Sequence, residues 1–193
     1  MTAVYRLAPL VRRLRGGGVI AYPTEAVYGL GCDPANPAAV AGLLALKGRQ
    51  AAKGLILIAA DLDQLRPWLA PLSPHQEQQL AEHWPGPITW LVPKAADVPA
   101  WLSGHHDTLA VRVTAHEPAA ALCRAFGGAL VSTSANRSGQ APARSALRAR
   151  SIFGGQLAGV LNAPLGGLRR PTEIRDLQSG RVIRAGDPGE SSA

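Results

Sequence analysis

The sequence predicts an α/β fold, because helical and strand-like patterns alternate along the chain, and the alternation is too irregular for an all-parallel sheet. A length of 193 residues with 47% apolar composition is enough for one domain with a sizeable core. No internal repeat or low-complexity linker divides the chain, so we predict a single domain over 1–186 and a frayed tail over 187–193. Ligands are expected where loops converge at the strand ends.

Helix signals recur at regular intervals. Asn36 followed by Pro37 is typical of an N-cap and a first helical position, and Ser73 with Gln76 is typical of a capping box. A short helix is also expected after Asp61, ending near Arg66. The two capped helices are predicted over 37–47 and 74–83. Further helices are predicted over 7–15, 118–126 and 146–153.

Apolar runs of strand length, bounded by glycine or proline, predict the sheet. The buried strands are expected at 19–22, 55–59, 88–92, 109–113 and 129–132, with weaker candidates at 172–176 and 181–184. Residues 23–33 are predicted to be a loop, since they combine proline, glycines, tyrosines and the carboxylate Glu25. Glu25 could orient a substrate amine, but pairing with a nearby arginine is the expected role.

The composition favours a polyanionic partner. The formal net charge is +7 and the sequence pI is about 10.2, which suits nucleotide phosphates or RNA. No apolar stretch is long enough to span a membrane and no signal peptide is evident, so a cytoplasmic protein is expected. Cys32 and Cys123 lack metal-ligand spacing and are predicted to be free, buried thiols.

Three polar features could bind a ligand, and each also has a structural interpretation. Lys47, Arg49 and Lys53 fall within seven residues at a helix end, where they could grip a triphosphate or complement the helix dipole. The stretch 132–136 puts serine, threonine and asparagine at a strand exit, which could serve a ligand or a simple turn. Arg112 in an apolar strand needs an anionic partner, either a protein carboxylate or a substrate.

Common nucleotide and metal motifs are missing from the sequence. No GxxxxGK[ST] motif occurs, and Gly29 and Gly31 lack the third glycine of a dinucleotide fingerprint. His105 and His106 lie in a polar segment and are more typical of solvated side chains than of metal ligands. We therefore expect no metal held by protein side chains.

Several motifs together resemble the YrdC/TsaC family of threonylcarbamoyl-adenylate synthases, in its compact bacterial form. The resemblance covers almost the whole chain. The motifs are Pro23-Thr24-Glu25-Ala26-Val27-Tyr28-Gly29-Leu30-Gly31, Lys47-x-Arg49, Trp84-Pro85-Gly86-Pro87-Ile88-Thr89, Leu109-Ala110-Val111-Arg112-Val113 and Ser134-Ala135-Asn136. It implies a twisted mixed sheet flanked by helices, with a large basic concave cavity.

The resemblance also implies a reaction. L-Threonine, bicarbonate and ATP with Mg²⁺ would give threonylcarbamoyl-adenylate and pyrophosphate, for the t6A modification at position 37 of tRNA. A downstream threonylcarbamoyl-transferase complex similar to TsaD, TsaB and TsaE would use the product. The transfer needs alignment and charge neutralisation more than a protein nucleophile.

Site residues follow from the matched motifs. The resemblance implies that Lys47 and Arg49 are catalytic and that Thr24, Arg112 and Ser132 bind threonine. The residues implied for ATP are Lys47, Arg49, Lys53, Thr108, Ser134, Asn136 and Arg184. The chain departs from longer relatives at Ala26 and Ile58, where those carry threonine and often histidine, so the amino-acid pocket is where selectivity could differ.

Replacing Lys47 or Arg49 by alanine is expected to abolish adenylate formation and to leave the fold intact, because both should lie on a loop or helix end. The main alternative is a ribosome-maturation factor that binds double-stranded RNA or rRNA through phosphate contacts. Direct contact with tRNA or double-stranded RNA is also a candidate partnership of the synthase. A carbamoyl-adenylating domain of a hydrogenase maturation protein is a third candidate, but its accompanying modules are not found in this sequence.

Overall fold

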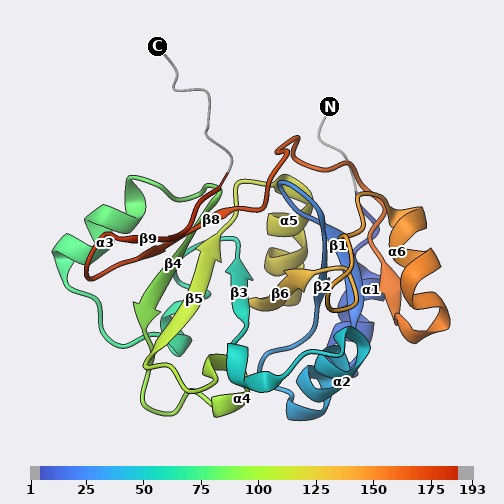
Figure 1. Cartoon of the computed structure of the whole chain (residues 1–193), viewed down its shortest axis with the longest axis horizontal. Coiled ribbons are helices and arrows are strands. Elements are labelled where there is room, and N and C mark those ends of the chain that lie inside the picture. The colour runs from blue at the N-terminus through green and yellow to red at the C-terminus, as the bar shows by residue number, and fades with distance from the viewer. Residues whose placement is uncertain (1–4, 187–193) are drawn as a thin grey trace.

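The computed structural model describes residues 5–186, so the tail predicted at 187–193 lies outside the described residues. Nine strands of the described chain form one mixed sheet in the order β7-β1-β2-β6-β3-β5-β4-β8-β9 (Figure 1). They are β1 (Ile20–Pro23), β2 (Tyr28–Gly31), β3 (Ile56–Ala59), β4 (Ile88–Pro93), β5 (Thr108–Val113), β6 (Leu130–Ser134), β7 (Gly159–Val160), β8 (Glu173–Asp176) and β9 (Val182–Arg184).

Three strand pairs are parallel, namely β1 with β7, β3 with β5 and β4 with β8. The other neighbouring pairs are antiparallel. The helices are α1 (Ala8–Arg15), α2 (Pro37–Lys47), α3 (Pro74–Ala81), α4 (Ala100–Ser103), α5 (Glu117–Phe126) and α6 (Ala146–Phe153), with 3-10 turns η1 (Ala51–Lys53), η2 (Arg66–Trp68) and η3 (Gly154–Gln156). The predicted mixed α/β fold is confirmed.

The two faces of the sheet are covered unequally. Because successive strand side chains point to opposite faces, Ile20 and Tyr22 of β1 pack with α1 and α5, whereas Ala21 joins the larger core with α2 and α6. The side chains packed under α1 and α5 form a second, smaller core cluster. Along β3 and β6 this cluster includes Ile58 and Leu130. The rest of that face is free to line a cavity.

Helix α2 ends in a way that separates two neighbouring cations. Asn36 caps its first turn by accepting a hydrogen bond from the Ala39 N–H at 3.1 Å, as predicted. Gly48 ends the helix with a left-handed φ of 60°, a conformation that side-chain-bearing residues rarely adopt. The chain therefore turns sharply between Lys47, which is buried, and Arg49, which is half-buried.

The loop predicted over 23–33 is wrong, because most of it is a β-hairpin in which β2 pairs with β1. Tyr28 and Leu30 alternate into the larger core, while Gly29 and Gly31 occupy the opposite face. A Cβ on Gly31 would lie 2.7 Å from the Val131 carbonyl oxygen, so only glycine allows this strand to approach so closely. The missed signal is thus an alternation between large residues and glycines.

The predicted helix after Asp61 is also wrong. The Asp61 carboxylate accepts a hydrogen bond from the Gln64 N–H at 2.9 Å, but the segment forms only a turn followed by η2. Pro67 lacks the N–H that a helix would need and restricts the residue before it. The short elements α4 and β7 were not predicted either, since each is too short to carry a periodic pattern.

The predicted state of the cysteines is confirmed. Cys32 and Cys123 are both buried and free. Burial raises the pKa of each thiol to about 12, so both remain protonated at neutral pH.

Candidate active site

A cavity of about 520 Å³ lies on the part of the sheet face that α1 and α5 leave uncovered. Ile58 packs against α5, whereas Ile56, two residues earlier on the same face, lines the cavity. Thr108, Ala110 and Arg112 line it at every second position of β5. The floor is therefore built by strand residues, while the loops at strand ends, where we predicted the ligand to bind, contribute Thr24, Arg49 and Asn136 to the lining.

Nine of the ten predicted site residues line this one cavity. They are Thr24, Arg49, Lys53, Thr108, Arg112, Ser132, Ser134, Asn136 and Arg184. Four of these are basic, and within the described residues the lining includes no aspartate or glutamate. His106, predicted to be solvated, is exposed but also lines the cavity. Segments that are far apart in sequence thus meet in a positively charged hollow.

Arg49 is held at one end of the cavity. Its Nη2 donates a hydrogen bond to the Gly54 carbonyl oxygen at 3.0 Å. Its Nε is buried and has no hydrogen-bond partner within the described residues. Burial also lowers the pKa of Arg49, which nevertheless stays protonated because a guanidinium is a very weak acid. Arg49 therefore presents unused donors where an anion could bind.

Lys47 is the predicted site residue that does not line the cavity. It is 3% exposed, and its Nζ donates to the Ser134 carbonyl oxygen at 2.5 Å and to the Asn136 carbonyl oxygen at 3.1 Å. It also lies 3.2 Å from Asn136 Oδ1, which accepts a hydrogen bond from Ser134 Oγ at 2.6 Å. Lys47 thus lies behind the cavity wall and holds residues 134–136 in place.

Lys47 is the last residue of α2, as predicted, but it is buried there, so its position at a helix end is no reason to expect that its loss leaves the fold intact. The helix ends at Lys47, but the chain at 134–138 packs over that end, and the Ser138 N–H donates to the Lys47 carbonyl oxygen at 2.8 Å. Burial, and to a smaller extent the nearby Arg49, lowers the pKa of Lys47 to about 8.

Replacing Lys47 by methionine is expected to lower the free energy of unfolding by about 2 kcal/mol, because three partly buried oxygens lose a donor. The pKa of Lys47 is about 8 in the native state against an ordinary value of 10.5, so the unfolded chain binds more protons between these values. Wild-type stability therefore rises relative to the variant as pH increases through this window.

Urea unfolding of both proteins at pH 7.5 and 9.5 measures this effect. The deficit of the methionine variant should be larger at pH 9.5. An equal deficit at both pH values would contradict the assigned protonation, and no deficit at either pH would contradict the structural role of Lys47.

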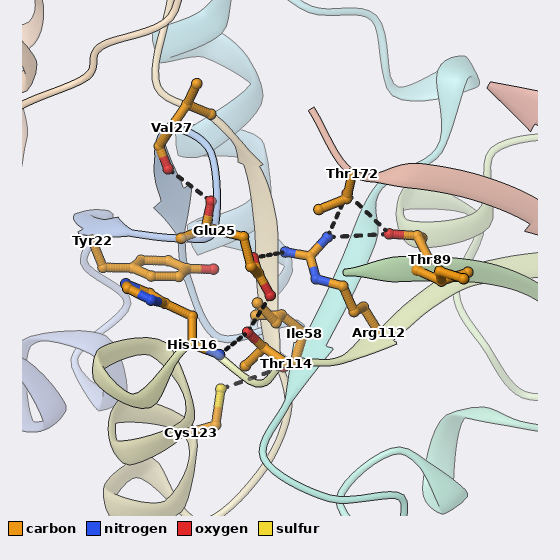
Figure 2. Close-up of polar contacts among 12 residues, drawn as sticks. Tyr22, Glu25, Val27, Ile58, Thr89, Arg112, Thr114, His116, Cys123 and Thr172 are labelled. Carbon is orange, nitrogen blue, oxygen red and sulfur yellow. Dashed lines mark hydrogen bonds and ion pairs between the residues drawn. The ribbon is translucent and has the colours of Figure 1, made fainter. Parts of the chain in front are cut away.

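Arg112 is buried in a network of hydroxyl groups and one carboxylate (Figure 2). Its Nη2 contacts Glu25 Oε2 at 3.2 Å, and both side chains are almost fully buried. The same Glu25 carboxylate accepts a hydrogen bond from Thr114 Oγ1 at 2.5 Å. Arg112 Nη1 donates to Thr89 Oγ1 at 3.1 Å and to Thr172 Oγ1 at 2.9 Å.

This network answers one question that the sequence left open. Arg112 pairs with a protein carboxylate, and the predicted structural pairing of Glu25 is confirmed. Arg112 also lines the cavity, and its buried Nε has no hydrogen-bond partner among the described residues. Such a fixed guanidinium can still offer donors to a ligand carboxylate. Thr114 and Thr172 were missed, since a lone threonine gives no sequence signal for such a role. Thr89 belongs to a matched motif, but it was not predicted as a site residue.

The comparisons with known proteins agree with this architecture. The family model described as "Telomere recombination", which covers Sua5, YciO and YrdC, matches residues 12–186. The chain belongs to the Sua5/YciO/YrdC family. A protein of Alkalilimnicola ehrlichii named threonylcarbamoyl-AMP synthase is 58% identical over 189 residues, covering 95% of this chain and 97% of that one. A protein of Halorhodospira halophila with the same name is 56% identical, covering 95% and 96%.

Solved structures of the family share the fold. P. abyssi Sua5 complexed with L-threonine is 31% identical, with a TM-score of 0.85 over 92% of this chain. This chain spans about half of that longer Sua5 chain, 53% of its length. E. coli YciO gives a TM-score of 0.81 at 25% identity, covering 93% of this chain and 88% of that chain.

The two departures from longer family members lie in different places. Ala26 lines the cavity, whereas Ile58 is fully buried under α5 and does not.

Within residues 5–186, no helix has the length and apolar character needed to cross a membrane. No group of three or more His, Cys, Asp or Glu side chains in that range could hold a metal ion.

Proposed function

We propose that this protein is an L-threonylcarbamoyladenylate synthase, a nucleotidyltransferase that uses L-threonine, bicarbonate and Mg²⁺–ATP. The observation that carries the proposal is the single cavity of about 520 Å³, lined by four basic side chains and several hydroxyl groups, in a chain of this family. Its size suits a nucleotide beside a small amino acid.

Threonine binds at the end of the cavity formed by Thr24, Arg112 and Ser132. Arg112 is held by Glu25 and has donors left for the threonine carboxylate. Thr24 is already used in part, because its Oγ1 donates to the Val27 carbonyl oxygen at 2.7 Å and so shapes the hairpin turn. The substrate is thereby oriented by groups that need not move on binding.

ATP binds along Arg49, Lys53, Thr108, Ser134, Asn136 and Arg184. The magnesium ion arrives with ATP as part of the substrate, held by phosphate oxygens and water, because the described lining supplies no carboxylate. The basic side chains neutralise the charge that develops as pyrophosphate leaves. Lys47 does not line the cavity, but its Nζ holds the backbone of Ser134 and Asn136 in place by hydrogen bonds to their carbonyl oxygens.

The reaction has two bond-forming steps. The threonine amine attacks the bicarbonate carbon, and loss of water leaves a carbamate. A carbamate oxygen then attacks the α-phosphorus of ATP while the bond to the bridging oxygen of pyrophosphate breaks. Neither step needs a covalent enzyme intermediate, so alignment and charge neutralisation by the cavity are sufficient.

The product would serve the t6A modification of tRNA in the cytoplasm through a downstream transferase complex. The relatives do not favour the RNA-binding alternative, since the similar curated proteins are named as synthases. Direct binding to tRNA or double-stranded RNA would instead weaken steeply with salt and would need no ATP.

Labelled bicarbonate provides the direct test. With threonine and Mg²⁺–ATP, the purified protein should produce a labelled adenylate and an equal amount of pyrophosphate. Omission of threonine, bicarbonate or ATP should abolish both products. Pyrophosphate release that is independent of threonine, or salt-sensitive RNA binding with no adenylate formed, would contradict the proposal.

A further inference from the structure

Thr172 contacts two arginines of the cavity at the same time. Its side chain accepts a hydrogen bond from Arg112 Nη1 at 2.9 Å, as Figure 2 shows. Its carbonyl oxygen accepts hydrogen bonds from Arg184 Nη2 at 2.7 Å and Nε at 3.3 Å. Thr172 is 7% exposed and itself lines the cavity. One buried residue thus joins the two guanidinium groups.

The position of Thr172 in the fold restricts the movement of its backbone, which carries the contacts to Arg112 and Arg184. Thr172 directly precedes β8, which is held between β4 and β9 in the sheet. Ile174 pairs with Thr89 on one side and with Arg184 on the other. The backbone at Thr172 is therefore anchored beside β4 and β9, although the β8–β9 register shifts between Ile174 and Arg175.

The two arginines repel each other, so their separation depends on what holds them. Partial burial, and to a smaller extent Arg112, lowers the pKa of Arg184, which indicates that the two charges interact. Arg112 is also held by Glu25 and Thr89, whereas the hydrogen bonds from Arg184 Nε and Nη2 both go to the Thr172 carbonyl oxygen. Thr172 offers one oxygen to each and limits the movement of both guanidinium groups.

We propose that Thr172 is a positioning residue that sets the separation of Arg112 from Arg184, and so aligns the threonine carbamate with the α-phosphorus of ATP. This inference rests on the proposed function, in which Arg112 holds the amino acid and Arg184 contacts the nucleotide. A misplacement of about 1 Å between reactants can cost about 100-fold in rate. Thr172 should therefore affect turnover more than the binding of either substrate.

Thr89 provides a matched control. Its hydroxyl accepts from the same Nη1 of Arg112 at 3.1 Å, and it is fully buried. Its Oγ1 lies 3.4 Å from Thr172 Oγ1, so the two hydroxyls share one environment. Thr89→Val and Thr172→Val each remove one acceptor from Arg112, but only the second breaks the link between Arg112 and the residue that holds Arg184.

The experiment compares the full-length wild type with Thr172→Val, Thr172→Ser and Thr89→Val. Pyrophosphate release gives kcat and the KM for threonine, calorimetry gives the Kd for ATP, and thermal unfolding checks the folded fraction. Thr172→Val should lower kcat about tenfold or more, with the Kd for ATP within about threefold of wild type. Thr172→Ser should restore kcat to within about twofold, and Thr89→Val should raise the KM for threonine while kcat stays within about threefold.

Other outcomes would overturn the inference. These are a kcat of Thr172→Val within twofold of wild type per folded molecule, a Thr172→Ser variant as slow as the valine variant, or an equal loss of kcat in Thr89→Val. In each case an active wild type would leave the proposed function standing. A wild type that binds neither threonine nor ATP would overturn both proposals.

Discussion

Replacing Glu25 by glutamine is expected to lower the free energy of unfolding by about 3 kcal/mol, which corresponds to about 10 °C in melting temperature for a chain of this size. Glu25 neutralises Arg112 in a place where both side chains are almost fully buried. Glutamine can still accept a hydrogen bond from Arg112 or Thr114, but it leaves the buried guanidinium charge unpaired. The threonine KM should rise as well, because Arg112 is no longer held. Thermal and urea unfolding measure the first effect, and pyrophosphate release measures the second.

Glu117→Gln is the matched control for this prediction. Glu117 pairs with Arg124 at 2.5 Å, but the two side chains are 56% and 49% exposed. Exposed ion pairs contribute little because water and salt screen them. The control should therefore show no measurable change in melting temperature. Similar losses in both variants would mean that burial of the Glu25–Arg112 pair is not what matters.

Arg49→Ala is expected to reduce kcat/KM for adenylate formation by about 100-fold to 1000-fold, the range found when one donor to a developing charge is removed. Arg49 lies in the cavity wall with a buried Nε that has no hydrogen-bond partner in the described chain. Its Nη2 donates a hydrogen bond to the Gly54 carbonyl oxygen. Pyrophosphate release at saturating threonine and bicarbonate, together with ATP binding by calorimetry, measures the loss.

Two further variants sharpen this test. Arg49→Lys keeps a positive charge but loses the planar arrangement of donors, so an intermediate rate is expected. Arg124→Ala removes an arginine from α5, outside the cavity, and should leave turnover unchanged. Thermal unfolding confirms that each variant is folded. Wild-type turnover by a folded Arg49→Ala protein would refute a role for Arg49 in the reaction.

Local sequence signals predicted most of the fold. The cap at Asn36, the capping box at Ser73 and the glycines that follow the helices set element ends that depend on neighbouring residues only. The failures occur where distant residues decide. Strand β2 pairs with β1 and β6, and Gly31 lies so close to the Tyr22 ring and the Val131 carbonyl oxygen that no Cβ would fit there. Nothing within residues 28–31 alone reveals that the space beside them is filled.

The candidate site was predicted through its motifs, but the individual roles were not. A lysine at a helix end is normally exposed, and Lys47 is buried because the chain at 134–138 folds over it. Likewise, the partners of Arg112 come from the first hairpin, β4 and the residue before β8. Thr114, the residue after β5, binds the same Glu25 carboxylate. Their meeting depends on strand order, which periodic patterns do not encode.

By itself the sequence determined the fold class, the positive charge and the motifs that mark the family, because these depend on composition and on short-range spacing. Only the tertiary structure decided that Arg112 pairs with Glu25, that Lys47 supports the cavity from behind and that Thr172 joins two arginines. The physical reason is that burial and partner choice are set by contacts between residues up to about ninety positions apart. Those contacts give each polar side chain its function.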